Sequence, residues 1–253
     1  MRRIGLAVVL AVGCGLMPLD TEAQPVTKRI GYLAIVEIEE WDEAFLNGLQ
    51  EHGFVPGRNI QIEYRFAGGN AERLGQLAAG LVDLKVDVIF VSGTQALDVA
   101  KLATKTIAIV FPVGSPVESG DIANLARPDG NLTGLTTLNV VVVAKRLELL
   151  KEAVPRLSQV AVLWNPRNSA SALTNQGTQE AARRLGIRLQ SLEVRNSGDL
   201  DTAFQAIVKE HPGALVATPD NFLFSQRVAS STLPQKIGCP EFSARRSGCR
   251  SAA

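Results

Sequence analysis

Residues 86–94 read VDVIFVSGT, and this stretch decides the fold class. Its first six residues are almost all apolar, which is typical of a strand in a parallel sheet that helices cover on both faces. The polar turn that follows, Ser92, Gly93 and Thr94, leads into a helical pattern from Gln95. A strand, a short turn and a helix in this order form the repeating unit of an α/β protein.

The same unit recurs along most of the chain. Short runs rich in β-branched residues alternate with longer stretches in which apolar residues recur three or four positions apart, which is the period of a helix. This alternation predicts an α/β fold with open parallel sheets. The eight predicted strands are Arg29–Ala34, Ile60–Phe66, Val86–Val91, Ile107–Phe111, Leu132–Thr137, Gln159–Trp164, Ile187–Val194 and Ala214–Thr218.

A segment rich in proline and glycine interrupts this rhythm at residues 112–131. After it the alternation restarts with a fresh strand, so two lobes fit the pattern better than one sheet of eight strands. We therefore expect an N-terminal α/β lobe over residues 28–137 and a second α/β lobe over residues 138–229, with a connection near residues 137–141.

The composition excludes several classes of protein. The 253 residues carry 26 Lys and Arg against 25 Asp and Glu, and this balance argues against a nucleic-acid binder. Two histidines, His52 and His211, are too few for a His-rich metal site, and residues 24–229 contain no cysteine. No Walker A, G-x-G-x-x-G, H-E-x-x-H, C-x-x-C or G-x-S-x-G pattern occurs. The sequence therefore predicts no metal site and no cofactor, and it favours binding over catalysis.

The first 23 residues have the form of a secretory signal peptide. Arg2 and Arg3 precede an apolar run over residues 4–16, and small residues stand at the positions expected before a cut after Ala23. The apolar run is well short of the ~20 residues that span a bilayer. The alternative is a lipoprotein signal with acylation at Cys14. Either form predicts an exported protein, in the periplasm or otherwise outside the cytoplasm.

In an open α/β sheet, ligands bind where the carboxyl ends of strands lead into helix N-termini. Four loops of this sequence hold that position. Their hydroxyls, side-chain amides and free backbone amides suit a carboxylate or another small polar group, although each loop is also explained as a plain cap or turn. The candidate ligand-binding residues are Ser92, Gly93, Thr94, Gly114, Ser115, Asn165, Asn168 and Asp220.

The loop after the first strand is unusually acidic, with five carboxylates between Glu37 and Glu43. Acidic residues near the first turn of a helix complement its dipole, which is a purely structural explanation. Two functional explanations stand beside it. One is a site for a ligand amine, and the other is an exported α/β enzyme that uses these acids, or Ser115 with a distant base.

Several long segments of the chain resemble a known family. They read KRIGYL, FLNGLQEHGFVPGRNIQIEYRFAGGNAERLGQLAAGLVDLKVDVIFVSGT, ARPDGNLTGLTTL, KRLELLKEAVPRLSQVAVLWNP and LEVRNSGDLDTAFQAI. In order and spacing they are similar to the tryptophan/tyrosine-type substrate-binding proteins of ABC transporters, over about residues 28–229.

This resemblance implies a type I periplasmic-binding fold, in which two α/β lobes around a hinge close on a small solute. It also implies a membrane permease as the partner that receives the solute, with amino acids among the expected ligands. By the same resemblance Ser92, Thr94, Ser115 and Asn168 are the leading contacts.

The resemblance stops near Ala229. Residues 230–253 are rich in Ser and Arg, carry four basic residues against one acidic residue, and follow neither the helical nor the strand period. Members of the family continue at this point with further strands and helices. We therefore expect a disordered tail, an incomplete second lobe, and a truncated protein whose solute binding is impaired.

Overall fold

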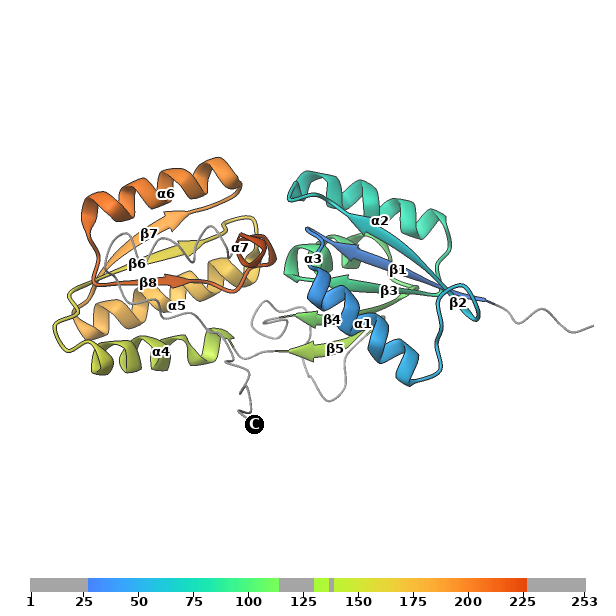
Figure 1. The fold of residues 1–253 in the computed structure, drawn as a ribbon, viewed down its shortest axis with the longest axis horizontal. Coiled ribbons are helices and arrows are strands. Elements are labelled where there is room, and N and C mark those ends of the chain that lie inside the picture. Colours follow the sequence, from blue (N-terminus) through green and yellow to red (C-terminus); the bar gives the residue numbers. More distant parts are fainter. Residues whose placement is uncertain (1–26, 114–129, 137–138, 227–253) are drawn as a thin grey trace, which may run out of the picture.

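The computed structural model describes residues 27–113, 130–136 and 139–226. These residues form two α/β lobes that lie side by side along the long axis of the molecule, each built on a parallel sheet (Figure 1). The predicted fold class, two lobes with open parallel sheets, is confirmed. The predicted signal peptide, the tail after residue 229 and the two site residues Gly114 and Ser115 lie outside the described residues.

The first lobe contains a five-stranded sheet in the order β2-β1-β3-β4-β5. All neighbouring pairs are parallel, and Ile30 of β1 aligns with Val88 on one side and Ile62 on the other. The elements are β1 Lys28–Ala34, α1 Glu39–Glu51, β2 Ile60–Phe66, the 3₁₀ turn η1 Ala71–Arg73, α2 Leu74–Asp83, β3 Val88–Ser92, α3 Thr94–Ala103, β4 Ala108–Val113 and β5 Leu132–Thr136.

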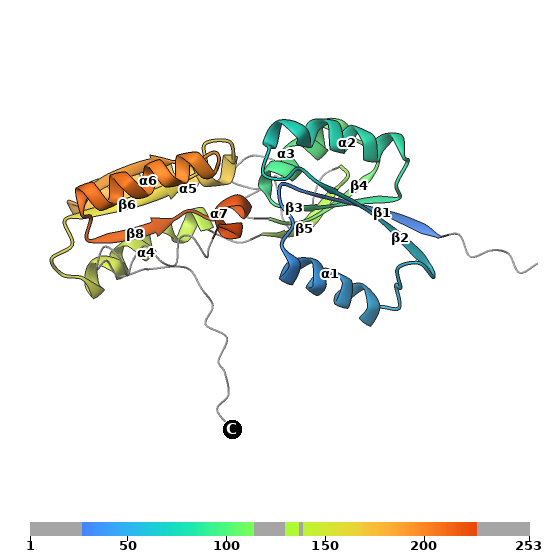
Figure 2. The ribbon, with the colours of Figure 1, turned by 45° about the horizontal axis from the view of Figure 1, so that its top comes forward.

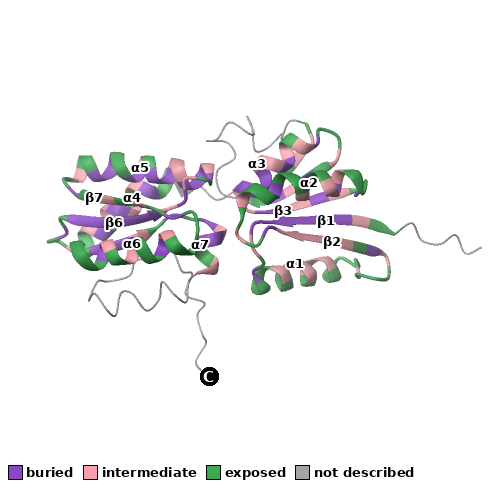
Figure 3. Ribbon diagram, turned by 90° about the horizontal axis from the view of Figure 1, so that it is seen from above, coloured by how far each residue is buried: buried purple, intermediate pink, exposed green. Residues whose placement is uncertain are grey.

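The second lobe contains a three-stranded sheet in the order β7-β6-β8, and it is also parallel throughout. Its central strand β6 is buried along almost its whole length (Figure 3). The elements are α4 Asn139–Ala153, β6 Gln159–Trp164, α5 Ser169–Leu185, β7 Arg188–Glu193, α6 Ser197–Glu210, β8 Ala214–Ala217 and α7 Asn221–Ser225.

The faces of the two sheets are covered to different extents. In the first lobe α2 and α3 lie on one face and enclose an apolar core, whereas α1 stands alone against the other face (Figure 2). Helix α1 has no fully buried side chain, and Trp41 on it is 38% exposed. In the second lobe α4 and α5 pack on one face of the sheet, and α6 and α7 pack on the other.

The second lobe is the smaller of the two within the described residues. Strand β8, Ala214–Ala217, is paired there on one side only, with β6. It is a sheet edge without a charged residue, whereas the opposite edge strand β7 carries Arg188 and Glu193. Charged side chains on an edge strand oppose pairing with another chain, so β7 is protected and β8 is not. This arrangement matches the predicted incomplete second lobe.

All eight predicted strands are present, with ends that differ by at most two residues. The largest shifts are in β3, which begins at Val88 rather than Val86, and in β4, which ends at Val113 rather than Phe111. Asp87 is held outside the β3 ladder because its carboxylate accepts a hydrogen bond from the backbone amide of Arg29 at 2.8 Å. Among the described residues no helix is both long and apolar enough to cross a membrane.

Candidate functional site

Both sheets begin with the same topology. In each lobe the first strand of the chain lies between the second and the third, which gives the orders β2-β1-β3 and β7-β6-β8. The chain therefore leaves β1 and β3, and likewise β6 and β8, in opposite directions. Between such strands an α/β sheet has a crevice at their carboxyl ends, where ligands bind. The loops that carry the predicted site residues begin at these two crevices.

The turn after β3 brings Ser92, Gly93 and Thr94 to the edge that faces the second lobe. Ser92 is 6% exposed. Gly93 has φ +103° and ψ 156°, a conformation that is almost restricted to glycine. Helix α3 begins directly after it at Thr94, and no side chain caps its N-terminus. The partial positive charge of this helix end therefore lies next to the Ser92 hydroxyl.

In the second lobe, Asn165, Asn168 and Asp220 come together from two loops. One carboxylate oxygen of Asp220 accepts hydrogen bonds from Asn168 Nδ2 at 2.8 Å and from Asn165 Nδ2 at 3.2 Å. Its other oxygen accepts the backbone amide of Leu223 at 2.9 Å and so caps α7. Burial raises the pKa of Asp220, and the hydrogen bonds that it accepts offset part of this effect. The three side chains thus tie the loops after β6 and β8 into one buried unit.

A pair of hydroxyl groups adds a further contact to this buried unit. Ser171 Oγ and Thr218 Oγ1 lie 2.6 Å apart, and Ser171 Oγ also accepts the backbone amide of Asn165 at 2.9 Å. Asn168 uses its side-chain oxygen to accept the amides of Ala170 and Ser171, which caps α5. Each asparagine amide nitrogen donates one of its two hydrogens to Asp220, so one N–H of each is left for another partner.

The two lobes touch through residues from these loops. Asn221 Nδ2, at the start of α7, donates to the backbone oxygen of Ser92 at 3.0 Å and lies 3.5 Å from its hydroxyl. Ser169 Oγ donates to Asp98 at 3.0 Å. The rings of Trp41 and Phe224 stack with centroids 4.8 Å apart. Hydrogen bonds and ring contacts therefore join the carboxyl ends of the two sheets directly.

The first turn of α1, which follows β1, adds a carboxylate at the same end of the sheet. The hydroxyl of Tyr32, which is 2% exposed, donates to Asp42 Oδ1 at 2.5 Å. Burial, followed by the contact with Asp42, raises the pKa of Tyr32. Phe45, Tyr64 and Phe90 surround the Tyr32 ring with centroid distances of 5.0 to 5.3 Å. Tyr32 thus joins the first turn of α1 to the sheet face on which Ser92 lies.

Six of the eight predicted site residues are described, and they fall into two groups at the facing ends of the lobes. Sequence reasoning did not select Tyr32, because a tyrosine inside an apolar strand is usually a core residue. It treated Asp42 as one of five similar acids and did not select Asn221. A signal for Asp42 existed in the chain, since it is three residues before Phe45 on a helix and therefore shares the face of the helix that meets the sheet.

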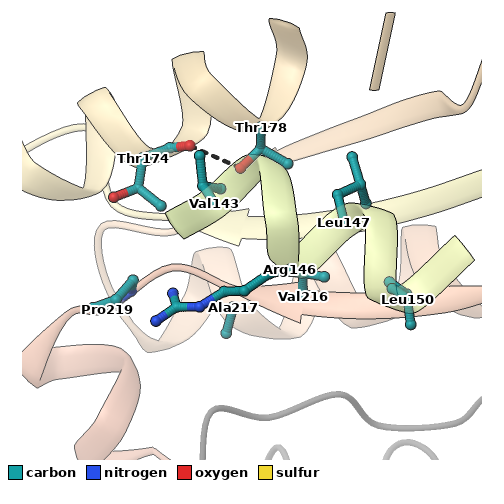
Figure 4. Close-up of a pocket in the computed structure, with 9 residues that line it drawn as sticks. All are labelled: Val143, Arg146, Leu147, Leu150, Thr174, Thr178, Val216, Ala217 and Pro219. Carbon is teal, nitrogen blue, oxygen red and sulfur yellow. Dashed lines mark hydrogen bonds between the residues drawn. The ribbon is translucent and has the colours of Figure 1, made fainter. Parts of the chain in front are cut away.

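A separate cavity of about 70 Å³ lies inside the second lobe, between α4, α5 and β8 (Figure 4). Its walls are mostly apolar, with Leu147, Leu150 and Val216 prominent among them. Ligand sites are usually 300 to 1,000 Å³, so this cavity is too small for an amino acid. It also contains none of the predicted site residues. Within the described residues, no group of His, Cys, Asp and Glu is placed to hold a metal ion.

The comparison with known families decides the identity of this two-lobed architecture. A family model described as ABC transporter substrate binding protein matches residues 30–230. The chain belongs to this family. The resemblance seen in the sequence is confirmed, and the family is one of substrate-binding transport proteins rather than of enzymes.

Two relatives illustrate the place of the chain within the substrate-binding proteins. It is 26% identical over 230 residues to a tyrosine-binding protein of Clostridioides difficile, and this alignment covers 89% of the chain and 66% of that protein. It is 29% identical to a conserved domain protein of Vibrio cholerae, with a TM-score of 0.78 and coverage of 87% and 75%. The chain thus spans about two thirds to three quarters of these longer proteins.

Two further structures bear on the arrangement of the lobes. One is a streptococcal ABC domain in complex with L-Trp, at 19% identity, a TM-score of 0.75 and coverage of 87% and 75%. The other is a ligand-free, open substrate-binding protein of Clostridium difficile, at 25% identity, a TM-score of 0.51 and coverage of 85% and 73%. The chain superposes better on the complex although its sequence is closer to the open protein. In the present structure the two lobes touch, through the hydrogen bond from Asn221 Nδ2 to the backbone oxygen of Ser92.

Proposed function

We propose that this chain is the solute-binding component of an ABC importer and that it holds an amino acid between its two lobes. The observation that carries the proposal is the meeting of two topological crevices: the loops after β1 and β3 face the loops after β6 and β8, and Asn221 bonds Ser92 across the boundary. The two relatives described as binding tyrosine or L-Trp support an aromatic amino acid as the solute.

Ser92, Gly93 and Thr94 bind the carboxylate of the solute in this proposal. The uncapped N-terminus of α3 and the Ser92 hydroxyl supply the donors that an anion requires. Asn165, Asn168 and Asp220 form the opposing wall, where each asparagine retains one N–H for the solute. Gly114 and Ser115 complete the first-lobe side, as their position after β4 predicts.

The proposal includes the wider role of the protein, which its family membership supports. The protein is exported by its signal peptide, binds its solute outside the cytoplasm and delivers it to a membrane permease. Because the described sheet of the second lobe has three strands against five in the first, we expect weaker binding than in a protein with two complete lobes. A clamp needs both lobes and the connections that couple their closure.

Isothermal titration of the purified chain against the twenty amino acids and a set of small carboxylic acids tests the proposal. We expect aromatic amino acids to bind and Ser92→Ala to weaken them by about tenfold, which is the effect of one hydrogen bond to a charged group. Leu102→Ala is a matched control, because Leu102 is 79% exposed on the same helix that Ser92 precedes. If no member of the set binds at millimolar concentration, the proposed function is wrong.

A further inference from the structure

The Tyr32 hydroxyl fixes Asp42, on the first turn of α1, against the first sheet. It donates to Asp42 Oδ1 at 2.5 Å. Tyr32 pairs with Phe90 on the neighbouring strand β3, so Ser92, two residues further along β3, lies on the same face of the sheet. A carboxylate and a hydroxyl next to an uncapped helix N-terminus therefore share this face at the ends of β1 and β3.

The second carboxylate oxygen of Asp42 is buried and has no hydrogen-bond partner among the described residues. A buried carboxylate oxygen without a donor is more unfavourable than a neutral acceptor in the same place, because the charge has lost its hydration. Tyr32 already supplies its one hydroxyl hydrogen to the first oxygen of Asp42. The second oxygen therefore needs a donor that the neighbouring side chains of the fold do not provide.

The surroundings of Asp42 favour a cation as that donor. Exposed carboxylates at Glu39, Glu40 and Glu43 share its helix, and α1 contains no lysine or arginine to balance them. The adjacent Trp41 stacks on Phe224 of the second lobe, and Phe45 lies against Tyr32. Aromatic faces and negative charge both attract ammonium groups, and the same faces give an aromatic side chain an apolar surface to contact.

We propose that Asp42 is the residue that recognises the ammonium group of the solute, so that the solute is an α-amino acid with a free amine. This inference rests on the proposed function, and it specifies the class of solute. An α-amino acid carries its ammonium and its carboxylate on one carbon, and Tyr32 holds Asp42 at the sheet face that Ser92 shares. The Asp42 carboxylate binds the ammonium, and Ser92 with the N-terminus of α3 binds the carboxylate.

The first arm of the test changes the protein. Asp42→Asn keeps the size of the side chain and removes its charge, and we expect it to weaken binding of L-tyrosine by about 10- to 100-fold. Glu43→Gln removes the same charge from the exposed neighbouring position and should change the affinity by less than about threefold, since exposed charges are well screened. Equal loss in both variants would mean that the effect is a general field, and would overturn the direct contact.

The second arm changes the ligand and needs no variant. Wild-type protein should bind 3-(4-hydroxyphenyl)propanoate, which lacks the amine, about 10- to 100-fold more weakly than L-tyrosine, and Asp42→Asn should bind the two ligands about equally. If the amine-free acid binds wild type as tightly as L-tyrosine, Asp42 does not read an amine, although the proposed function stands. If neither ligand nor any amino acid binds, both the inference and the proposed function fail.

Discussion

The close approach of the two lobes depends on the absence of a side chain at Gly93. A Cβ at this position would lie 2.6 Å from Asn221 Nδ2 and 3.0 Å from its Cγ. Asn221 is held in place by its hydrogen bond to the backbone oxygen of Ser92. We therefore expect Gly93→Ala to hinder closure of the lobes as well as to strain the turn.

Two costs of Gly93→Ala can be separated. The backbone at φ +103° is unfavourable for alanine in any state of the lobes, and this lowers the free energy of unfolding by about 1–3 kcal/mol. Moving Asn221 aside breaks its bond to Ser92, which removes about 1 kcal/mol from the closed state alone. A cost confined to the closed state lowers solute affinity by about fivefold, because binding must then supply that free energy.

Gly186→Ala is the matched control. Gly186 also has a positive φ, +65°, but a Cβ there would meet nothing within 4 Å, and it ends α5 in the body of the second lobe. Urea unfolding followed by circular dichroism should show a loss of about 1–2 kcal/mol for this variant, while its solute affinity by titration calorimetry should equal that of wild type. Only Gly93→Ala should lower both quantities.

Asn221→Ala completes the test as a double-mutant cycle. If the alanine methyl at position 93 acts through Asn221, adding Asn221→Ala to Gly93→Ala should cause little further loss of affinity, because the bond to Ser92 is already broken. Two losses that simply add would show that the residues act independently. An unchanged affinity in Gly93→Ala, with destabilisation equal to that of Gly186→Ala, would refute the reasoning about closure.

Two other predictions concern the second lobe. Burial raises the pKa of Asp220 above its ordinary value of 3.8, so the folded chain binds this proton more tightly than the unfolded chain. The proton therefore contributes to the free energy of unfolding below pH 3.8, and this contribution is lost as the pH rises through the raised pKa. Urea unfolding at several pH values should therefore show wild type losing stability relative to Asp220→Asn over that interval, and a constant difference would contradict the pKa direction. Phe224→Ala removes the ring that stacks on Trp41, which should cost closure about 0.5–1.5 kcal/mol and change Trp41 emission in a Trp164→Phe background. Unchanged emission in that variant would show that the stack is absent in solution.

The sequence predicted the local elements well because their signals are local. The apolar run of β3 and the polar turn that follows it act over a few residues, and both were found close to where the pattern placed them. The loop positions of Ser92 and Asn165 followed from the same alternation. Strand ends were less accurate because contacts between strands, such as Asp87 with the amide of Arg29, decide where a ladder begins.

The amino-acid sequence by itself determined the strand–helix order, the α/β class and the polar loops that end the strands, since periodicity and capping depend on near neighbours. Only the tertiary structure decided which loops meet and what each polar side chain does there. Asn221 and Ser92 are 129 residues apart, and Asp42 differs from its acidic neighbours only because Tyr32 reaches it from β1. Contacts of this kind depend on sheet order and lobe packing, which no local pattern encodes.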